Sequence, residues 1–293
     1  MLISFTKMHG LGNDFVVIDA VTQPIAMTAA LARAIADRHY GVGCDQILLI
    51  TPSPHSSADF GYRIFNADGS EVFQCGNGAR CVGLFIQRKR LSDKKSIALV
   101  TERSQMMVHI QSETQIVIEI DAPDFDPASL PFSTHEKKSP YHFFLDDEKI
   151  VFDIVSVGNP HVVMMVDDLS WVDVSHLGKT ISHHTAFPEG TNVSFVQWLS
   201  SNKVKLCVYE RGAGITGACG SGACAAVAVG RKKRLLENTV QVYQSGGELT
   251  VTWTGKKDDS LYLTGPAEFV FDGVWHKDQQ FPTNVRKTTT FQI

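Results

Sequence analysis

The chain has 293 residues, 43% of them hydrophobic and 20% charged, with a net charge of −4. The length predicts two domains with a hydrophobic core each, and the balanced charge excludes a partner held mainly by nucleic-acid phosphates. The N-terminus has no signal-peptide pattern, and the longest near-apolar stretch, residues 223–229, is too short to cross a membrane. We therefore expect a soluble cytoplasmic protein, with no nucleic-acid or membrane partner.

Short apolar patterns predict many strands and few helices. In the first half, strands are predicted at residues 2–8, 15–19, 46–50, 62–65, 97–101, 107–111 and 115–120. A helix is predicted at 28–39, with Thr28 as its N-cap. Residues 121–149, rich in Pro, Asp and Ser, mark the change of domain. Later strands are predicted at 150–157, 162–166, 193–198, 204–209, 240–243, 249–253, 261–264 and 269–271. This order predicts an α+β fold with antiparallel sheets.

The sequence contains a weak internal repeat. Residues 12–18 (GNDFVVI) align with 158–164 (GNPHVVM), 146 positions later, and 75–79 (CGNGA) align with 219–223 (CGSGA), 144 positions later. A helix is predicted after each Cys-Gly-x-Gly segment, and basic residues follow it, which suits a helix C-terminus. The chain thus looks like two copies of one unit, residues 1–125 and 126–293, with the last ~20 residues able to pack back on the first domain.

Cysteine usage is unusual for such a chain. The six cysteines are Cys44, Cys75, Cys81, Cys207, Cys219 and Cys224. No C-x-x-C or zinc-ligand spacing is present, and a disulfide framework is not expected in a reducing cytosol, so we expect no metal. Cys75 and Cys219 each precede a glycine-rich turn that opens a helix, where free N–H groups bind anions and lower a thiol pKa from about 8.5 towards neutrality. Cys81 and Cys224 are predicted to be core residues.

Two equivalent thiols suggest a specific chemistry. If the repeat places Cys75 and Cys219 face to face across a cleft between the domains, one can remove a proton from a substrate carbon while the other donates a proton to the opposite face. The stereocentre is then inverted. A single base would tend to return the proton to the face that it left.

Long sequence blocks resemble one known family. They are residues 8–15 (MHGLGNDF), 65–70 (FNADGS), 74–81 (QCGNGARC), 158–161 (GNPH), Asn192, 210–214 (ERGAG) and 218–224 (ACGSGAC). The resemblance is to diaminopimelate epimerase, a pyridoxal-phosphate-independent amino-acid epimerase. It implies two pseudo-symmetric half-barrels around central helices, a site between them, a homodimer, no cofactor, and interconversion of LL- and meso-diaminopimelate on the route to lysine and peptidoglycan.

The resemblance also assigns roles to residues. Cys75 and Cys219 are the acid/base thiols, Cys219 taking the proton in the LL-to-meso direction, and His161 and Glu210 tune them. The backbone at Gly76, Asn77, Gly220 and Ser221 holds the reacting carboxylate. The remaining substrate-binding positions are Asn13, Gln46, Asn66, Asn159, Asn192, Glu210 and Arg211. Of these, Arg211 suits a bidentate contact with the distal carboxylate.

The departures from the family pattern are few. Ile215 and Gly217 stand where polar or charged residues are frequent, and Ser221 replaces a frequent threonine. Other readings remain open. A proline racemase or hydroxyproline epimerase shares the two-thiol logic but acts on a substrate without a second amino-acid centre, and phenazine-type isomerases lack the paired cysteines. Two further readings are a thiol redox or zinc protein and a non-catalytic binding module.

Overall fold

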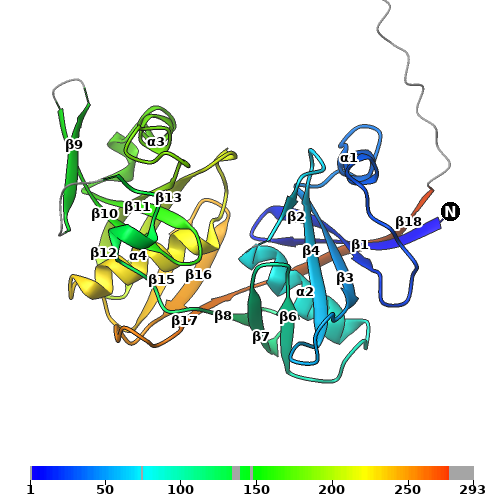
Figure 1. The fold of residues 1–293 in the computed structure, drawn as a ribbon. Coiled ribbons are helices and arrows are strands. Elements are labelled where there is room, and N and C mark those ends of the chain that lie inside the picture. The colour runs from blue at the N-terminus through cyan, green and yellow to red at the C-terminus, as the bar shows by residue number, and fades with distance from the viewer. Residues whose placement is uncertain (1, 74, 134–138, 146–147, 277–293) are drawn as a thin grey trace, which may run out of the picture.

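The computed structural model describes residues 2–73, 75–133, 139–145 and 148–276, which form two strand-rich halves (Figure 1). The first half contains β1 (Leu2–Gly10), β2 (Asn13–Asp19), α1 (Ala29–Ala36), β3 (Gln46–Pro52), β4 (Phe60–Asn66), β5 (Glu71–Val72), α2 (Gly76–Arg88), β6 (Ser96–Val100), β7 (Gln105–Ser112) and β8 (Gln115–Ile120). The second contains β9 (Tyr141–Leu145), β10 (Glu148–Ser156), β11 (Pro160–Val166), α3 (Val174–Ser182), β12 (Asn192–Ser200), β13 (Lys203–Glu210), β14 (Gly214–Ile215), α4 (Gly220–Lys232), β15 (Thr239–Gln244), β16 (Gly247–Thr252) and β17 (Leu261–Gly265); β18 (Glu268–His276) follows. The predicted α+β class, with a central helix in each strand-rich half, is confirmed.

The prediction of purely antiparallel sheets is wrong. Four strand pairs are parallel: β2 with β3, β4 with β6, β11 with β12, and β13 with β15. Parallel neighbours need a crossover connection, and in each of these four cases the crossover contains a helix, α1, α2, α3 or α4. The sequence pattern missed α3 because two of its four buried residues, Gly178 and Ser182, are not apolar.

The helix predicted at residues 28–39 is shorter than expected. Thr28 is its N-cap, as predicted, and its side chain accepts a hydrogen bond from the backbone N–H of Leu31. The helix ends at Ala36 because Asp37 turns the chain, its carboxylate accepting the N–H groups of His39 and Tyr40 at 2.8 Å each.

The sequence repeat is also a structural repeat. Phe15 pairs with Gln46 between β2 and β3, and His161 pairs with Asn192 between β11 and β12. Each residue of the second pair lies 146 positions after the corresponding residue of the first pair. Helices α2 and α4 each have 13 residues and begin 144 positions apart. The two halves therefore share one strand order and one register.

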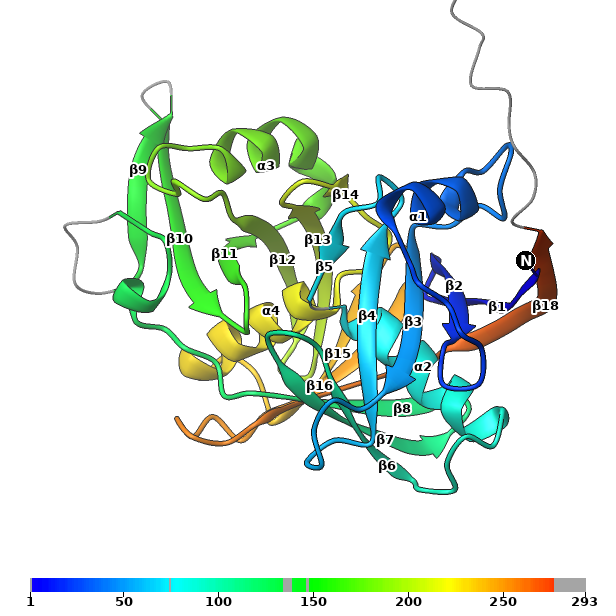
Figure 2. The same cartoon turned by 45° about the vertical axis from the view of Figure 1, so that its right-hand side comes forward.

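The halves are joined by a strand pair and by an exchange of strands. Antiparallel strands β8 and β17 pair across the junction, with Ile118 opposite Leu263. Strand β18 follows the second half in the chain but pairs with β1 of the first half. In the same way, β9 follows β8 of the first half in the chain but pairs with β10 of the second half. Residues 277–293, most of the C-terminal stretch expected to pack on the first domain, lie outside the described residues. Figure 2 shows α2 and α4 running outward from the middle of the molecule in opposite directions.

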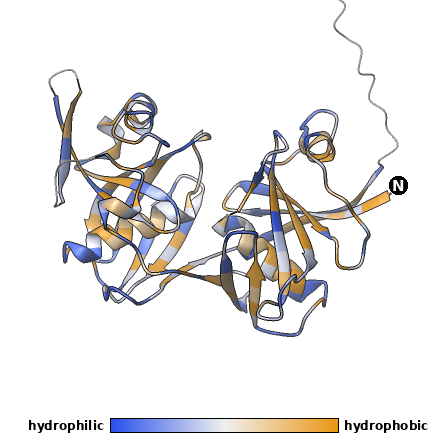
Figure 3. Ribbon diagram, viewed as in Figure 1, coloured by the Kyte–Doolittle hydropathy of each residue, from blue (hydrophilic) through white to orange (hydrophobic). Residues whose placement is uncertain are grey.

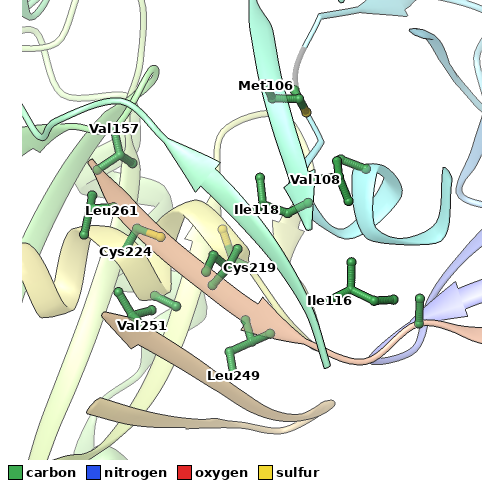
Figure 4. Packing of buried hydrophobic residues seen from close by; sticks show 14 of the residues in the cluster. Met106, Val108, Ile116, Ile118, Val157, Cys219, Cys224, Leu249, Val251 and Leu261 are labelled. Atoms are coloured by element: carbon green, nitrogen blue, oxygen red, sulfur yellow. The ribbon is translucent and has the colours of Figure 1, made fainter. Parts of the chain in front are cut away.

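Both central helices are enclosed by strands. Nearly every residue of α2 and α4 beyond the first turn is buried, which is the pattern of a helix surrounded by protein on all sides. Hydrophobic residues gather in the strands and in these helices, and peripheral loops are mainly hydrophilic (Figure 3). One apolar cluster spans both halves, with residues from β8, α4 and β17 packed together at the junction (Figure 4). Cys81 and Cys224 are fully buried in this cluster, as expected.

Leu263 is the side chain on which the junction packs. Its side chain is fully buried. Its Cδ2 atom would lie 3.5 Å from a Cβ added at Gly76 and 2.8 Å from a Cβ added at Gly220, so Leu263 packs against the starts of both helices. We expect Leu263→Ala to lower the free energy of unfolding by about 2–5 kcal/mol, because it opens a cavity between the two helix ends. Urea denaturation measures this loss. Tyr262→Ala, on the exposed face of the same strand, is the control and should cost less than half as much; equal losses would contradict the role given to Leu263.

Candidate active site

Each predicted catalytic cysteine is the N-cap of a central helix. Cys75 and Cys219 have extended backbone, and the sulfur of each accepts a hydrogen bond from the N–H three residues later, at 3.3 Å from Gly78 and 3.4 Å from Gly222. The first N–H groups of a helix have no partner inside the helix, and the sulfur takes the place that an oxygen usually fills in such a cap. Gln74, just before Cys75, lies outside the described residues.

The two helix starts lie against each other at the junction. The side-chain amide of Asn77, in the first turn of α2, donates a 3.2 Å hydrogen bond to the carbonyl of Ala218, directly before Cys219. A Cβ at Gly220 would lie 3.8 Å from Asn77 Oδ1. The Glu210 carboxylate, at the end of β13, is close enough to raise the pKa of both Cys75 and Cys219. Two thiols 144 residues apart in the chain therefore cap helix starts that contact each other.

The pKa of each thiol differs in direction from the sequence-based expectation. Burial raises the pKa of Cys75 to about 11, and burial together with the neighbouring Glu210 carboxylate raises that of Cys219. The N–H groups at the helix starts lower both pKa values, as expected, but burial is the larger effect. Burial therefore favours the protonated form of both thiols at neutral pH, and a nearby positive charge would favour ionisation.

The surroundings of Cys219 are richer in polar groups than those of Cys75. Its sulfur lies 3.5 Å from the Ser221 hydroxyl, which lies 3.0 Å from Nε2 of His161, and the Cys219 thiol donates to Glu210. Gln244 of β15 was not predicted: its Oε1 accepts the Cys219 N–H at 2.8 Å and its Nε2 donates to the Cys219 carbonyl at 3.4 Å. A single glutamine in a strand carries no sequence motif, so only the fold reveals this clamp.

His161 is a buried, neutral imidazole. It is 1% exposed, and burial together with the Arg211 guanidinium lowers its pKa to about 3. Its Nε2 lies within 3.1 Å of both Ser221 Oγ and Asn159 Oδ1. His161 therefore acts on the Cys219 side through hydrogen bonding and not through a positive charge.

In the first half, the side-chain amides of Asn13 and Gln46 are each held by their nitrogen. Asn13 Nδ2 donates to Asp45 Oδ2 at 3.1 Å, and an amide held by its nitrogen presents its oxygen. Gln46 Nε2 donates to Asn66 Oδ1 at 2.9 Å, while Gln46 Oε1 has no partner among the residues that the structure describes. Asn66 in turn donates to Ser70 at 3.0 Å, so both ends of its amide are used. The oxygens of Asn13 and Gln46 are the acceptors that suit a substrate ammonium.

In the second half, the corresponding amides hold the protein itself. Asn192 donates to the carbonyl of Pro160 at 3.1 Å and accepts the backbone N–H of Arg211 at 3.0 Å, so both ends of its amide are used. Asn159 donates to Ser221 at 3.3 Å. Asn192 thus positions Arg211, whose exposed guanidinium donates to the Glu189 carbonyl at 2.9 Å.

The one hollow described below lies away from the two thiols. A hollow of about 450 Å³, lined by Arg231, Leu236 and residues 237–239, lies at the far end of α4 from Cys219. Within the described ranges, no cluster of His, Cys, Asp and Glu has the geometry of a metal site. No helix there has the length and apolar character needed to span a membrane.

Comparison with known proteins decides the family. The family model for diaminopimelate epimerase matches residues 5–125 and 154–270, most of the chain. The chain belongs to the diaminopimelate epimerase family. It is therefore a member of a superfamily of cofactor-independent epimerases and isomerases, which confirms the resemblance drawn from its motifs.

Solved structures share the fold at low sequence identity. A hydroxyproline epimerase from Agrobacterium vitis, with bound trans-4-OH-L-proline, superposes with a TM-score of 0.70 at 14% identity, over 93% of this chain and 92% of that one. A probable proline racemase from Agrobacterium radiobacter gives 0.67 at 14% identity, over 96% and 94%. A PhzF-family phenazine biosynthesis protein from Bacillus anthracis gives 0.66 at 16%, over 94% and 99%. At these identities the likeness establishes the fold alone.

The burial of His161 predicts a pH effect on stability. Because its pKa is about 3 in the folded chain and near 6.5 when unfolded, the unfolded state binds the extra proton between these values. Folding should therefore lose up to about 1.4 kcal/mol per pH unit as the pH falls from 6.5. His161→Gln should remove this part of the slope in urea titrations at pH 7 to 4.5. The exposed His176→Gln is the control, and an unchanged slope in His161→Gln would contradict the assignment.

Proposed function

We propose that this protein is a diaminopimelate epimerase that interconverts LL- and meso-2,6-diaminopimelate by two-base proton transfer at the α-carbon. The observation that carries the proposal is the pair of thiols, each capping its own helix, with one carboxylate, Glu210, acting on both. Two such thiols suit inversion at carbon, because one can remove a proton from one face while the other donates a proton to the opposite face.

In the LL-to-meso direction, Cys219 takes the proton. Its thiolate forms an S–H bond as the C–H bond breaks, and the electron pair stays on the α-carbon and its carboxylate. The Cys75 S–H bond then breaks, and its proton bonds to the opposite face of the carbon. The N–H groups at Gly76, Asn77, Gly220 and Ser221 would hold the carboxylate, where the helix N-termini stabilise the developing charge. The reverse direction exchanges the two roles.

The raised thiol pKa values fit a substrate-assisted ionisation. A buried thiol ionises more readily beside a positive charge, and the α-ammonium of an amino acid brings one to the site. Glu210 and the neutral His161, linked to Cys219 through Ser221, would tune the thiol that starts as the base in the LL direction.

Arg211 and the side-chain amides suit the second amino-acid centre of diaminopimelate. Arg211, positioned by Asn192, offers a guanidinium for the distal carboxylate. Asn13, Gln46, Asn66 and Asn159 would read the distal ammonium and carboxylate through their amides. In the first half, the position that corresponds to Arg211 in the repeat is Ala67. The guanidinium is therefore present in one half only, as a substrate with one distal centre requires. Proline and hydroxyproline have no such centre, which places their racemisation second.

The remaining expectations follow from the same assignment. We infer that the enzyme works in the cytoplasm as a homodimer, without cofactor or metal, in the synthesis of lysine and peptidoglycan precursors. We also infer that the first domain is residues 1–125 and the second 126–293, with Cys75 and Cys219 as their respective catalytic residues.

Turnover of LL-diaminopimelate in heavy water tests the proposal. We expect meso product with deuterium at the inverted α-carbon, in purified protein with chelator and no pyridoxal phosphate. Cys75→Ala and Cys219→Ala should each lower epimerisation by at least about 10²–10⁴-fold while circular dichroism stays native. Cys207→Ala, a half-buried cysteine on β13, is the control. Near-normal turnover in either catalytic variant would exclude two-base chemistry, and inversion of proline or hydroxyproline alone would favour the second candidate.

A further inference from the structure

Two side-chain amides begin neighbouring strands of the first half. Asn13 is the first residue of β2, and Gln46 is the first residue of β3, which runs parallel to β2. Asn13 pairs with Gly10 of β1, where an added Cβ would lie 3.5 Å from the Cβ of Asn77 in the first turn of α2. The start of β2 therefore lies next to the helix start that Cys75 caps.

The amide of Asn13 is oriented by a carboxylate. Oδ2 of Asp45 accepts hydrogen bonds from Asn13 Nδ2 and from the backbone N–H of Asp14, each at 3.1 Å. Arg38 holds this carboxylate, because its Nη2 donates to Asp45 Oδ1 and to Asp14 Oδ1 at 2.8 Å each. An ionised carboxylate can only accept hydrogen bonds, so the amide nitrogen of Asn13 has to face Asp45 and its oxygen is left for a ligand.

The amide of Gln46 is oriented by a longer chain of hydrogen bonds that also ends at a carboxylate. The Ser70 hydroxyl donates to Asp68 Oδ1 at 2.6 Å, so its oxygen is the acceptor for Asn66 Nδ2 at 3.0 Å. Asn66 Oδ1 then accepts from Gln46 Nε2 at 2.9 Å. Each bond fixes the direction of the next, because a hydroxyl has one proton and an amide has one donor end and one acceptor end. The last atom, Gln46 Oε1, is buried and has no partner among the residues that the structure describes.

The turn that carries Asp68 and Ser70 is itself held in place. Arg33 of α1 donates to the Asp68 carbonyl at 3.1 Å, and the backbone N–H of Asn66 bonds to the Ser70 carbonyl at 2.8 Å. The hydrogen bonds from the Ser70 hydroxyl and backbone N–H lower the pKa of the Asp68 carboxyl. Asp68 is therefore ionised at neutral pH and acts only as an acceptor.

The second half lacks these groups at the corresponding repeat positions. In place of Asp45, Asp68 and Ser70 it has Thr191, Gly212 and Gly214. Both ends of the Asn192 amide bond to the backbone of its own half, which also carries the Arg211 guanidinium. The first half therefore offers acceptor oxygens and the second half a cation, an arrangement that suits one centre with an ammonium and a carboxylate.

We propose that Asp45 and the Ser70–Asp68 pair are positioning residues that fix the direction of these hydrogen bonds, so that Asn13 and Gln46 present only oxygens to the distal ammonium of the substrate. The proposal rests on the diaminopimelate function above. The amides alone have no such preference, because an amide that turns over presents its NH₂ group in place of its oxygen. The carboxylates, which stand one step or more behind the amides, make the turned form unfavourable.

Titration calorimetry with two ligands tests the proposal on the full-length protein. Diaminopimelate, supplied as the equilibrium mixture of its LL and meso forms so that turnover adds no heat, carries the distal ammonium. The compound 2-aminopimelate has the same carbon chain and both carboxylates but only one ammonium. The wild type should bind diaminopimelate at least about tenfold more tightly than 2-aminopimelate, because a hydrogen bond to a charged group is lost with the second ammonium.

Two substitutions remove the groups that fix the direction. Asp45→Asn gives Asn13 a partner that can also donate, so the amide can turn, and the Kd of diaminopimelate should rise at least about tenfold. The Kd of 2-aminopimelate should change by less than about threefold. Ser70→Ala removes the hydroxyl and leaves every charge in place, and it should act in the same direction. Ser70→Thr, which keeps the hydroxyl, should stay close to the wild type.

Asp19→Asn is the matched control, because it removes the same charge from the other end of β2, where the carboxylate accepts from Val21 and Thr22; it should move neither Kd. Equal losses for the two ligands in a folded variant, or no loss for either, would overturn the role given to the residue replaced. If Asp45→Asn does not fold, Ser70→Ala and Ser70→Thr decide.

The same titrations separate this proposal from the proposed function. Since calorimetry needs no turnover, binding of diaminopimelate without epimerisation would count against the proposed function alone. Epimerisation by a wild type that binds the two ligands equally well would count against the positioning roles alone. A wild type that binds neither ligand would overturn both.

Discussion

The site depends on one arrangement: two helix N-termini that meet at a junction, each capped by sulfur. The free N–H groups of a first helical turn normally bond to an oxygen or to water. Here the N–H groups of Gly78 and Gly222 bond to the sulfurs of Cys75 and Cys219. The Asn77–Ala218 hydrogen bond and the packing of Leu263 keep the two ends together. A change that moves either helix alters both thiols and the anion site at once.

Burial gives this arrangement its chemical character. A helix terminus at the surface lowers a thiol pKa, but desolvation at the junction raises the pKa of both thiols. Because burial favours the neutral sulfur, a nearby positive charge would favour ionisation of a thiol. On the Cys219 side the described neighbours include the neutral imidazole of His161 and the carboxylate of Glu210, and the Arg211 guanidinium lies close enough to lower the pKa of His161.

Sequence patterns predicted the local parts of this design well, and the long-range parts less well. The repeat located the two helix starts because Cys-Gly-x-Gly segments carry their own turn chemistry. The parallel pair of β11 with β12 crosses over through α3, which was missed because it buries polar and glycine positions that break the helical pattern. The net thiol pKa depends on atoms brought from distant strands, and Gln244 holds Cys219 from β15 without any motif. Such contacts exist only once the chain is folded, so no local pattern contains them.

A pseudo-symmetric scaffold solves only half of the problem of inverting a stereocentre. The shared register places the two sulfurs equivalently, but two sulfurs in identical surroundings would ionise equally, and much of the enzyme would carry two thiols or two thiolates. One proton must be shared unequally for a base and an acid to coexist. One residue that breaks the repeat near the thiols is Glu210, which stands where the first half has Asn66 and raises the pKa of both cysteines. Under the proposed two-base function, symmetry sets where the proton can go, and unlike residues of this kind would set where it starts.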